Sequence, residues 1–157
     1  MPAIGIDVGG TKCLGIVLDG DQVVAELRRP TPDTADGIID TLAALVGDLG
    51  DHRSVGIGVP GLVTREGVIR ASPNLTDVAD FDVAGLLGRR LGRSVVVDND
   101  ATCAAVAEWR AGAARGHRDA VVVTQVAHEG GDRVDDPVSG VWGGPSQLGH
   151  KLVAVEH

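Results

Sequence analysis

The first segment that could do chemistry is Asp7–Lys12, with the sequence Asp-Val-Gly-Gly-Thr-Lys. It lies between two apolar runs, residues 3–6 and 14–18, that are typical of β-strands. Two adjacent glycines let backbone N–H groups approach an anion closely, because no Cβ obstructs them. An aspartate before such a turn can hold hydrated magnesium, and a threonine and a lysine after it can reach phosphate oxygens. The segment is a candidate nucleotide-phosphate loop, although an ordinary glycine hairpin fits these six residues equally well.

The second polar cluster is Asp98–Asp100, between an apolar run and an alanine-rich segment. Asp and Asn are preferred helix N-caps, but one cap does not require three consecutive polar residues. The ends of sheet strands are also where α/β proteins place ligands. Asn99 has donor and acceptor groups for polyol hydroxyls, and Asp100 is a carboxylate that can accept a hydroxyl proton. The cluster is a candidate site for a polyol and for a general base.

The hydrophobic pattern predicts the elements that position these clusters. Strands at residues 3–8, 13–18 and 22–28, joined by two short turns, predict an antiparallel meander. A helix follows, capped by Asp33 or Thr34. Its apolar residues recur at helical spacing: Ile38, Ile39, Leu42, Leu45, Val46 and Leu49.

The rest of the chain predicts alternating strands and helices. Strands are expected at residues 54–59, 68–71, 95–97 and 120–124, and helices at 83–91 and 100–114. A meander followed by this alternation implies an α/β protein with a mixed sheet flanked by helices. Gly56–Gly61 fits the spacing GxGxxG, but a dinucleotide site needs a helix after those glycines and a strand pattern follows here, so that interpretation is rejected.

Composition narrows the possible partners. The chain has 157 residues, enough for one domain with its own core, and a formal net charge of −8, which disfavours nucleic acid. No apolar run reaches membrane-spanning length and no secretory leader opens the chain, so we expect a cytoplasmic protein without a membrane partner. Cys13 and Cys103 lack metal-ligand spacing; we expect both to be buried and expect no protein-held structural metal.

Taken together, four segments resemble the ROK-family sugar kinases, in which they occur in the same order. They are Asp7–Lys12, Gly56–Val63, Ser72–Leu75 and Val97–Ala101, and the resemblance covers about residues 3–124. That family has the actin-like ATPase (ribonuclease H-like) fold and includes bacterial glucokinases. The resemblance implies a sugar-kinase N-terminal lobe over residues 1–124. It also implies ATP and Mg²⁺ as cofactors and a hexose, with glucose favoured, as substrate.

The resemblance also assigns roles to single residues. By this resemblance, the residues that bind the nucleotide phosphates and magnesium are Asp7, Gly9, Gly10, Thr11 and Lys12. The residues that bind the sugar are, by the same resemblance, Gly61, Asn74, Asn99, Asp100 and His150. Among these, Asp100 resembles the catalytic base that acts on the hydroxyl attacking the γ-phosphate.

The chain departs from the family pattern after residue 124. Gln125–Gly131 stands where a second, glycine-rich phosphate loop is usual, and Gln147 stands where a sugar-binding Glu is usual. The cysteines of the family's zinc site do not follow, and His150 also fits an ordinary surface histidine. We therefore expect residues 125–157 to be a divergent tail or a remnant of the second lobe, and the chain to be a truncated kinase that is inactive by itself.

Two alternatives remain open from the sequence. A non-catalytic, sugar-binding remnant is consistent with the missing second phosphate loop. A sugar-responsive ROK transcriptional regulator would carry a helix-turn-helix before the first strand, whereas a strand is expected here from residue 3, and the acidic charge also disfavours DNA. A homodimer is compatible with either interpretation.

Overall fold

The structure is a computed structural model that describes residues 1–50, 52, 54–75, 78–118, 120–124 and 150–153. The chain forms two compact units, Met1–Asp100 and Ala101–His157. This division differs from the boundary expected after residue 124. That boundary stays a prediction, because residues 125–149 and 154–157 lie outside the described residues.

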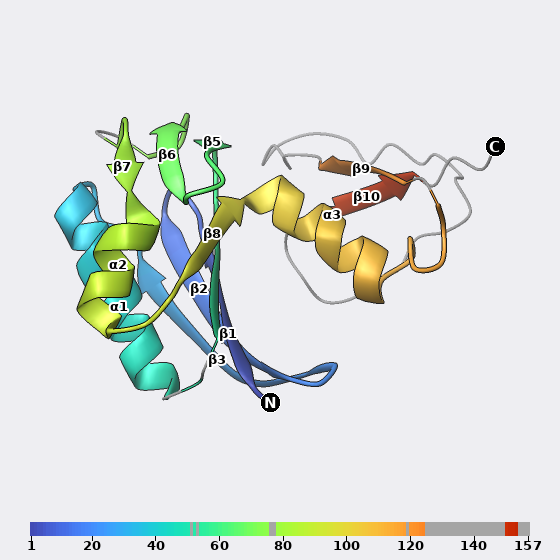
Figure 1. The fold of residues 1–157 in the computed structure, drawn as a ribbon, viewed down its shortest axis with the longest axis horizontal. Helices are drawn as coiled ribbons and strands as arrows, with labels where there is room; N and C mark the ends of the chain where they lie inside the picture. Colours follow the sequence, from blue (N-terminus) through green and yellow to red (C-terminus); the bar gives the residue numbers. More distant parts are fainter. Residues whose placement is uncertain (51, 53, 76–77, 119, 125–149, 154–157) are drawn as a thin grey trace. The chain divides into compact units, whose positions relative to one another are not determined.

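The first unit is built on a five-stranded sheet with the order β3-β2-β1-β4-β8 (Figure 1). Strands β1 (Ala3–Val8), β2 (Lys12–Asp19) and β3 (Gln22–Pro30) form the expected antiparallel meander. Strand β4 (Ser54–Val59) runs parallel to β1, and β8 (Val96–Asn99) runs parallel to β4. The predicted mixed sheet is confirmed, and the rejected dinucleotide motif indeed leads from β4 into a strand rather than a helix.

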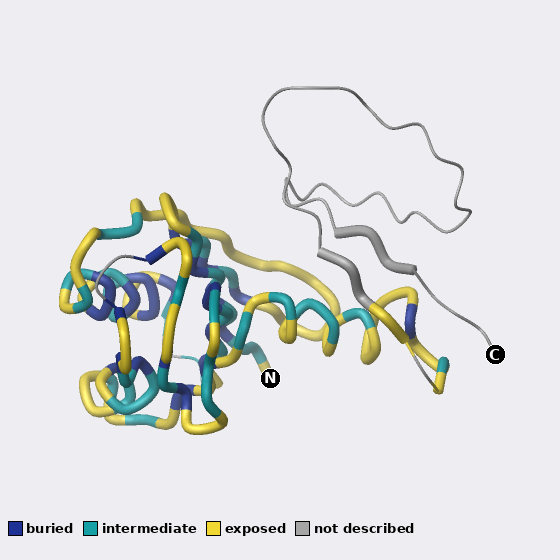
Figure 2. Tube along the Cα trace, turned by 90° about the horizontal axis from the view of Figure 1, so that it is seen from above, coloured by how far each residue is buried: buried dark blue, intermediate teal, exposed yellow. Residues whose placement is uncertain are grey.

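Helix α1 (Ala35–Leu49) packs against the three strands of the meander. The Thr34 side chain accepts a hydrogen bond from the Gly37 N–H at 3.2 Å, which caps the helix as predicted. All six apolar residues predicted for its inner face are buried. They pack on alternate residues of the central strands: Ile4, Ile6, Val8, Val55, Ile57 and Val59. Figure 2 shows this core as the buried segments of the first unit.

Helix α2 (Val83–Leu91) lies beside α1 and ends at Gly92, which adopts the left-handed conformation. Near it, β5 (Leu62–Val63), β6 (Val68–Ala71) and β7 (Phe81–Asp82) form a small antiparallel sheet. Strand β6 was expected, and so was a strand pattern after Gly61, where β5 lies. Strand β7 was not expected, because a strand of two residues has no hydrophobic period to read.

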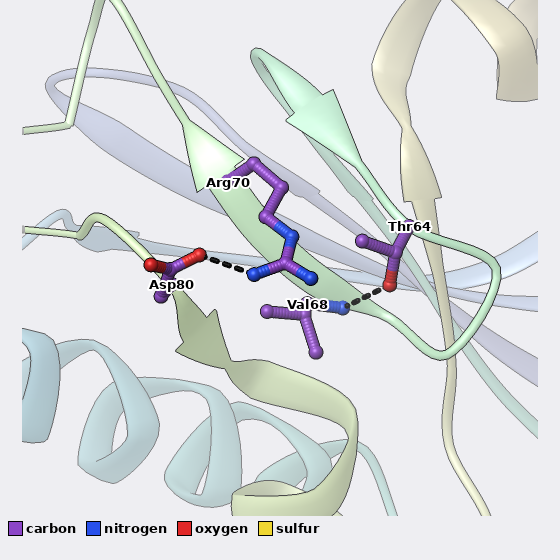
Figure 3. Close-up of polar contacts among 4 residues, drawn as sticks. All are labelled: Thr64, Val68, Arg70 and Asp80. Carbon is purple, nitrogen blue, oxygen red and sulfur yellow. Dashed lines mark hydrogen bonds and ion pairs between the residues drawn. The ribbon is translucent and has the colours of Figure 1, made fainter.

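Two polar contacts hold the small sheet, as Figure 3 shows. Arg70 Nη1 donates to Asp80 Oδ1 at 2.5 Å, which ties β6 to the residue before β7. The Val68 N–H donates to Thr64 Oγ1 at 3.3 Å, which closes the β5–β6 turn. The Glu66 carboxyl lies in that turn, and its hydrogen bond with Thr64 lowers its pKa.

The second unit contains most of α3 (Asp100–Ala111) and a two-stranded antiparallel sheet of β9 (Val121–Thr124) and β10 (His150–Val153). No residue of α3 is buried, and Cys103 is exposed, so the expectation that both cysteines are buried holds for Cys13 alone. Residue type favours burial of a cysteine, but only packing against a neighbouring element produces it. Among the described residues, no helix is both long and apolar enough to cross a membrane.

Candidate active site at the ends of the parallel strands

The two polar clusters predicted from the sequence lie at one edge of the large sheet. The strand register places Asp7 opposite Gly58, and Gly58 opposite Asp98. Residues directly opposite one another project to the same face, so Asp7 and Asp98 lie on one face, with backbones two strand spacings, or about 9.5 Å, apart. Asp7 is half-buried and Asp98 is exposed. This face is the one opposite α1, since Ile6 and Val8 point into the core.

The glycine loop between β1 and β2 is a closed turn. The Gly9 N–H donates to the Lys12 carbonyl at 2.9 Å, so this N–H serves the turn itself. Among the described residues, none accepts a hydrogen bond from the N–H group of Gly10 or of Thr11. Gly10, Thr11 and Lys12 are all exposed. The loop therefore offers its outer N–H groups and the Lys12 ammonium to an anion, but not the N–H of Gly9.

Thr31 supports this loop and was not found from the sequence. Its Oγ1 donates to the Gly9 carbonyl at 2.7 Å, and its N–H donates to the Thr11 carbonyl at 3.1 Å. Cys13 Sγ lies 3.4 Å from the same hydroxyl. Burial, the largest cause, raises the pKa of the Cys13 thiol, and the negative charge of Asp7 raises it further.

Asn74 lies next to the same loop. A Cβ added to Gly10 would meet the Asn74 carbonyl oxygen at 3.1 Å and the Asn74 Cβ at 3.3 Å. This close approach explains why a glycine suits position 10 even though its backbone angles are not in the left-handed region. The structure thus brings Asn74, predicted to approach the sugar, against the loop predicted to bind phosphate.

Asn99 is tied to Gly61, and both were predicted to face the sugar. Asn99 Nδ2 donates to the Gly61 carbonyl at 2.9 Å. Gly61 has φ of +111°, and a Cβ there would lie 2.1 Å from the Ala71 carbonyl oxygen. The neighbouring Ser72 hydroxyl is buried and makes no hydrogen bond with any described residue. This serine begins the Ser72–Leu75 segment of the resemblance, but the sequence assigned no role to it.

Asp100 is exposed and is the first residue of α3, directly after β8. The amino-terminal end of a helix favours a negative charge, and the Asp100 carboxylate lies at that end. His150 begins β10 in the second unit, opposite Thr124, and its role with the sugar stays a prediction. Gln147 and the replaced second phosphate loop lie outside the described residues.

The metal-ligating side chains at this edge fit a magnesium ion that is shared with substrate phosphates. They do not fit a metal ion that the protein holds with its own side chains alone. Within the described ranges, no three His, Cys, Asp or Glu side chains form a group that could hold a metal ion. Magnesium is usually bound through one or two carboxylates together with substrate phosphates and water. The Asp7 carboxylate next to a loop with outward N–H groups fits that arrangement.

Comparison with known protein families matches the ROK family over residues 3–156. Among characterised relatives, the glucokinase of Streptomyces coelicolor is 36% identical over 126 residues, covering 77% of this chain and 39% of that protein. The N-acetyl-D-glucosamine kinase of Shigella boydii is 40% identical over 111 residues, covering 66% of this chain and 36% of that protein. The chain thus spans less than half the length of these two relatives.

Solved structures agree with this assignment. The ROK glucokinase of Streptomyces griseus, solved with glucose and AMPPNP, superposes with a TM-score of 0.71 at 36% identity, covering 78% of this chain and 40% of that one. A ROK transcriptional regulator, a homologue of the Escherichia coli MLC protein, superposes with a TM-score of 0.60 at 19% identity, which shows a shared fold alone. The α/β, actin-like ATPase fold expected from the sequence is confirmed.

Proposed function

The chain belongs to the ROK family. From that membership we propose that it forms one lobe of an ATP-dependent hexose kinase, the lobe that carries the catalytic base, and that the sugar is glucose. The observation that carries the proposal is the hydrogen bond from Asn99 to Gly61. It joins the strand that leads to Asp100 with the turn expected to face the sugar. The parallel register places both at the same sheet edge as the Asp7–Lys12 loop.

In this proposal the glycine loop binds the nucleotide. The N–H groups of Gly10 and Thr11 and the Lys12 ammonium meet phosphate oxygens, while Gly9 shapes the turn through its hydrogen bond to Lys12. Asp7 would hold Mg²⁺, and the bound ion would supply neutralisation of the charge that develops on the transferring phosphoryl group.

The opposite part of the edge binds and activates the sugar. The Asn99 amide, which donates to the Gly61 carbonyl, and the Gly61 backbone would bind sugar hydroxyls. Asn74, which lies against the glycine loop, would approach the sugar from the nucleotide side. Asp100 accepts the proton of the attacking hydroxyl. We also propose His150, the first residue of β10, as a sugar-binding residue.

A chimera tests the function directly. Residues 1–124 replace the matching segment of the Streptomyces coelicolor glucokinase, and ADP release is measured with glucose, N-acetylglucosamine and mannose. We expect glucose to be the best substrate. A folded chimera that binds sugar without turnover would favour the alternative of a non-catalytic sugar-binding remnant. The regulator alternative rests on fold alone, because the likeness to that structure is at 19% identity.

Replacing Asp7 with alanine in this chimera is expected to weaken Mg-ATP binding by about 10- to 100-fold, because a charge-assisted contact is worth about 1.5–3 kcal/mol. Glucose affinity should change little, since Asp7 lies on the nucleotide side. Isothermal titration calorimetry measures both. Asp19→Ala is the matched control. It also removes one negative charge, but at the end of β2 that lies away from the glycine loop. If glucose binding collapsed while Mg-ATP binding persisted, the two sites would be assigned the wrong way round.

The polypeptide of residues 1–157 alone is expected to show no glucose phosphorylation. It supplies one wall of the proposed site and spans 39% of the glucokinase that it matches. Kinases gain much of their rate from holding both substrates in line and excluding water when lobes close. Mass spectrometry of glucose 6-phosphate after incubation with glucose and Mg-ATP checks this. Product that scales with protein and disappears in Asp100→Asn would contradict the expectation and show that residues 125–157 complete the site.

A further inference from the structure

Thr31 holds two carbonyl groups of the glycine loop at once. Its side-chain hydroxyl donates to the Gly9 carbonyl at 2.7 Å, and its own N–H donates to the Thr11 carbonyl at 3.1 Å. The residue comes from the end of β3, two strands away from β1, and not from the loop itself. A contact pair of this kind fixes the orientation of the loop backbone and not merely its distance from the sheet.

The segment around Thr31 is stiff on both sides. Pro30, the last residue of β3, precedes Thr31 and lies opposite Lys12. Pro32 comes directly after Thr31. Proline fixes its own φ and restricts the preceding residue to extended conformations, so Thr31 has little freedom. Pro32 packs against the first turn of α1, where a Cβ added to Gly37 would lie 2.8 Å from the Pro32 Cβ. Thr31 is thus anchored to both the sheet and the helix.

Cys13 completes a short chain of hydrogen bonds beneath the loop. The Thr31 hydroxyl has one proton and gives it to Gly9, so at the 3.4 Å contact the Cys13 thiol is the donor. Cys13 is fully buried, and burial raises the pKa of its thiol, which keeps the proton that this donation needs. The chain therefore runs from Cys13 through Thr31 to the Gly9 carbonyl.

The planar trans peptide connects this chain to the ligand side of the loop. The Gly9 carbonyl and the Gly10 N–H belong to one peptide unit, in which they point in opposite directions. Holding the carbonyl toward Thr31 therefore turns the Gly10 N–H away from Thr31, and Gly10 is exposed. We propose that Thr31 is a positioning residue that presents the Gly10 N–H to a nucleotide phosphate, a role that rests on the proposed function.

The test compares three variants of the full chain, labelled with ¹⁵N, during titration with Mg-AMPPNP. Thr31→Val removes the hydroxyl but keeps the branched shape and the N–H. We expect it to weaken AMPPNP binding by about tenfold, since a donor to a charged phosphate loses its orientation. Thr31→Ser keeps the hydroxyl, and we expect its affinity to stay within about twofold of the wild type. The Gly10 amide signal should move on titration in the wild type and in Thr31→Ser.

A third variant separates positioning from general stability. Thr34→Ala removes the cap of α1 and lowers the melting temperature without touching the loop, so we expect its AMPPNP affinity to remain that of the wild type. Should Thr31→Val fail to fold, Thr31→Ala is measured in its place.

Each outcome separates the two proposals. Wild-type affinity in Thr31→Val, or an equal loss in Thr34→Ala, would overturn the role of Thr31 and leave the proposed function standing. A wild-type chain whose Gly10 signal does not respond to Mg-AMPPNP would overturn the proposed nucleotide role of the loop, and the role of Thr31 with it.

Discussion

Replacing Asp100 with asparagine in the glucokinase chimera is expected to lower turnover by about 10²- to 10⁴-fold, the range typical of losing a general base. Asparagine has nearly the same size as aspartate and still accepts hydrogen bonds through its carbonyl oxygen, so the fold and glucose affinity should persist. Asp100 is exposed at the first position of α3, where the amide can stand as the carboxylate did. A coupled assay of ADP release measures turnover, and calorimetry measures glucose binding.

Asp98→Asn is the matched control for this prediction. It makes the same chemical change two residues earlier, on an exposed side chain whose Oδ1 accepts from the Asn99 N–H at 2.7 Å. Asparagine at position 98 can still accept that hydrogen bond through its carbonyl oxygen, so turnover should fall little. Near-normal turnover in Asp100→Asn would remove Asp100 from the mechanism. Equal losses in both variants would point to the charge of the cluster rather than to a base.

Replacing Gly61 with alanine is expected to cost about 2–5 kcal/mol of unfolding free energy and to abolish glucose binding. The added Cβ would lie 2.1 Å from the Ala71 carbonyl oxygen, and φ of +111° is strained for any residue with a Cβ. The backbone must move to relieve this. That movement shifts the carbonyl that accepts from Asn99 and displaces the end of β6.

Gly56→Ala shows whether the cost arises from this geometry or from losing any glycine near the site. Gly56 lies in β4, and a Cβ there would meet nothing within 4 Å. We therefore expect it to leave the unfolding free energy unchanged or slightly higher, because alanine restricts the unfolded chain. Urea unfolding of the 157-residue chain measures the unfolding free energy of the Gly61→Ala and Gly56→Ala variants. A Gly61→Ala chain as stable as the wild type would show that the turn tolerates a side chain, and would take away the reason for glycine at that position.

Much of the first unit could be predicted from the sequence because its elements are defined by local patterns. The helical spacing of Leu42, Leu45 and their neighbours identified the buried face of α1. The sequence offered Asp33 or Thr34 as its cap, and the structure shows that Thr34 is the cap. Short turns between the first three strands left an antiparallel meander as their simplest pairing. Both polar clusters were also visible, since each directly adjoins a strand whose apolar run is plain.

The sequence by itself therefore determined most of the elements and the two polar clusters, because each depends on residues close together along the chain, and the actin-like α/β fold followed from the resemblance to the ROK family. Only the tertiary structure decided what those residues contact. The strands β5 and β7 exist through pairing with β6, and Cys103 is exposed because α3 buries no side chain among the described residues. Thr31 lies 22 residues from the Gly9 carbonyl that it holds, a distance closed only when β3 pairs with β2 and β2 with β1. Such contacts follow from strand register, which no local pattern around Thr31 encodes.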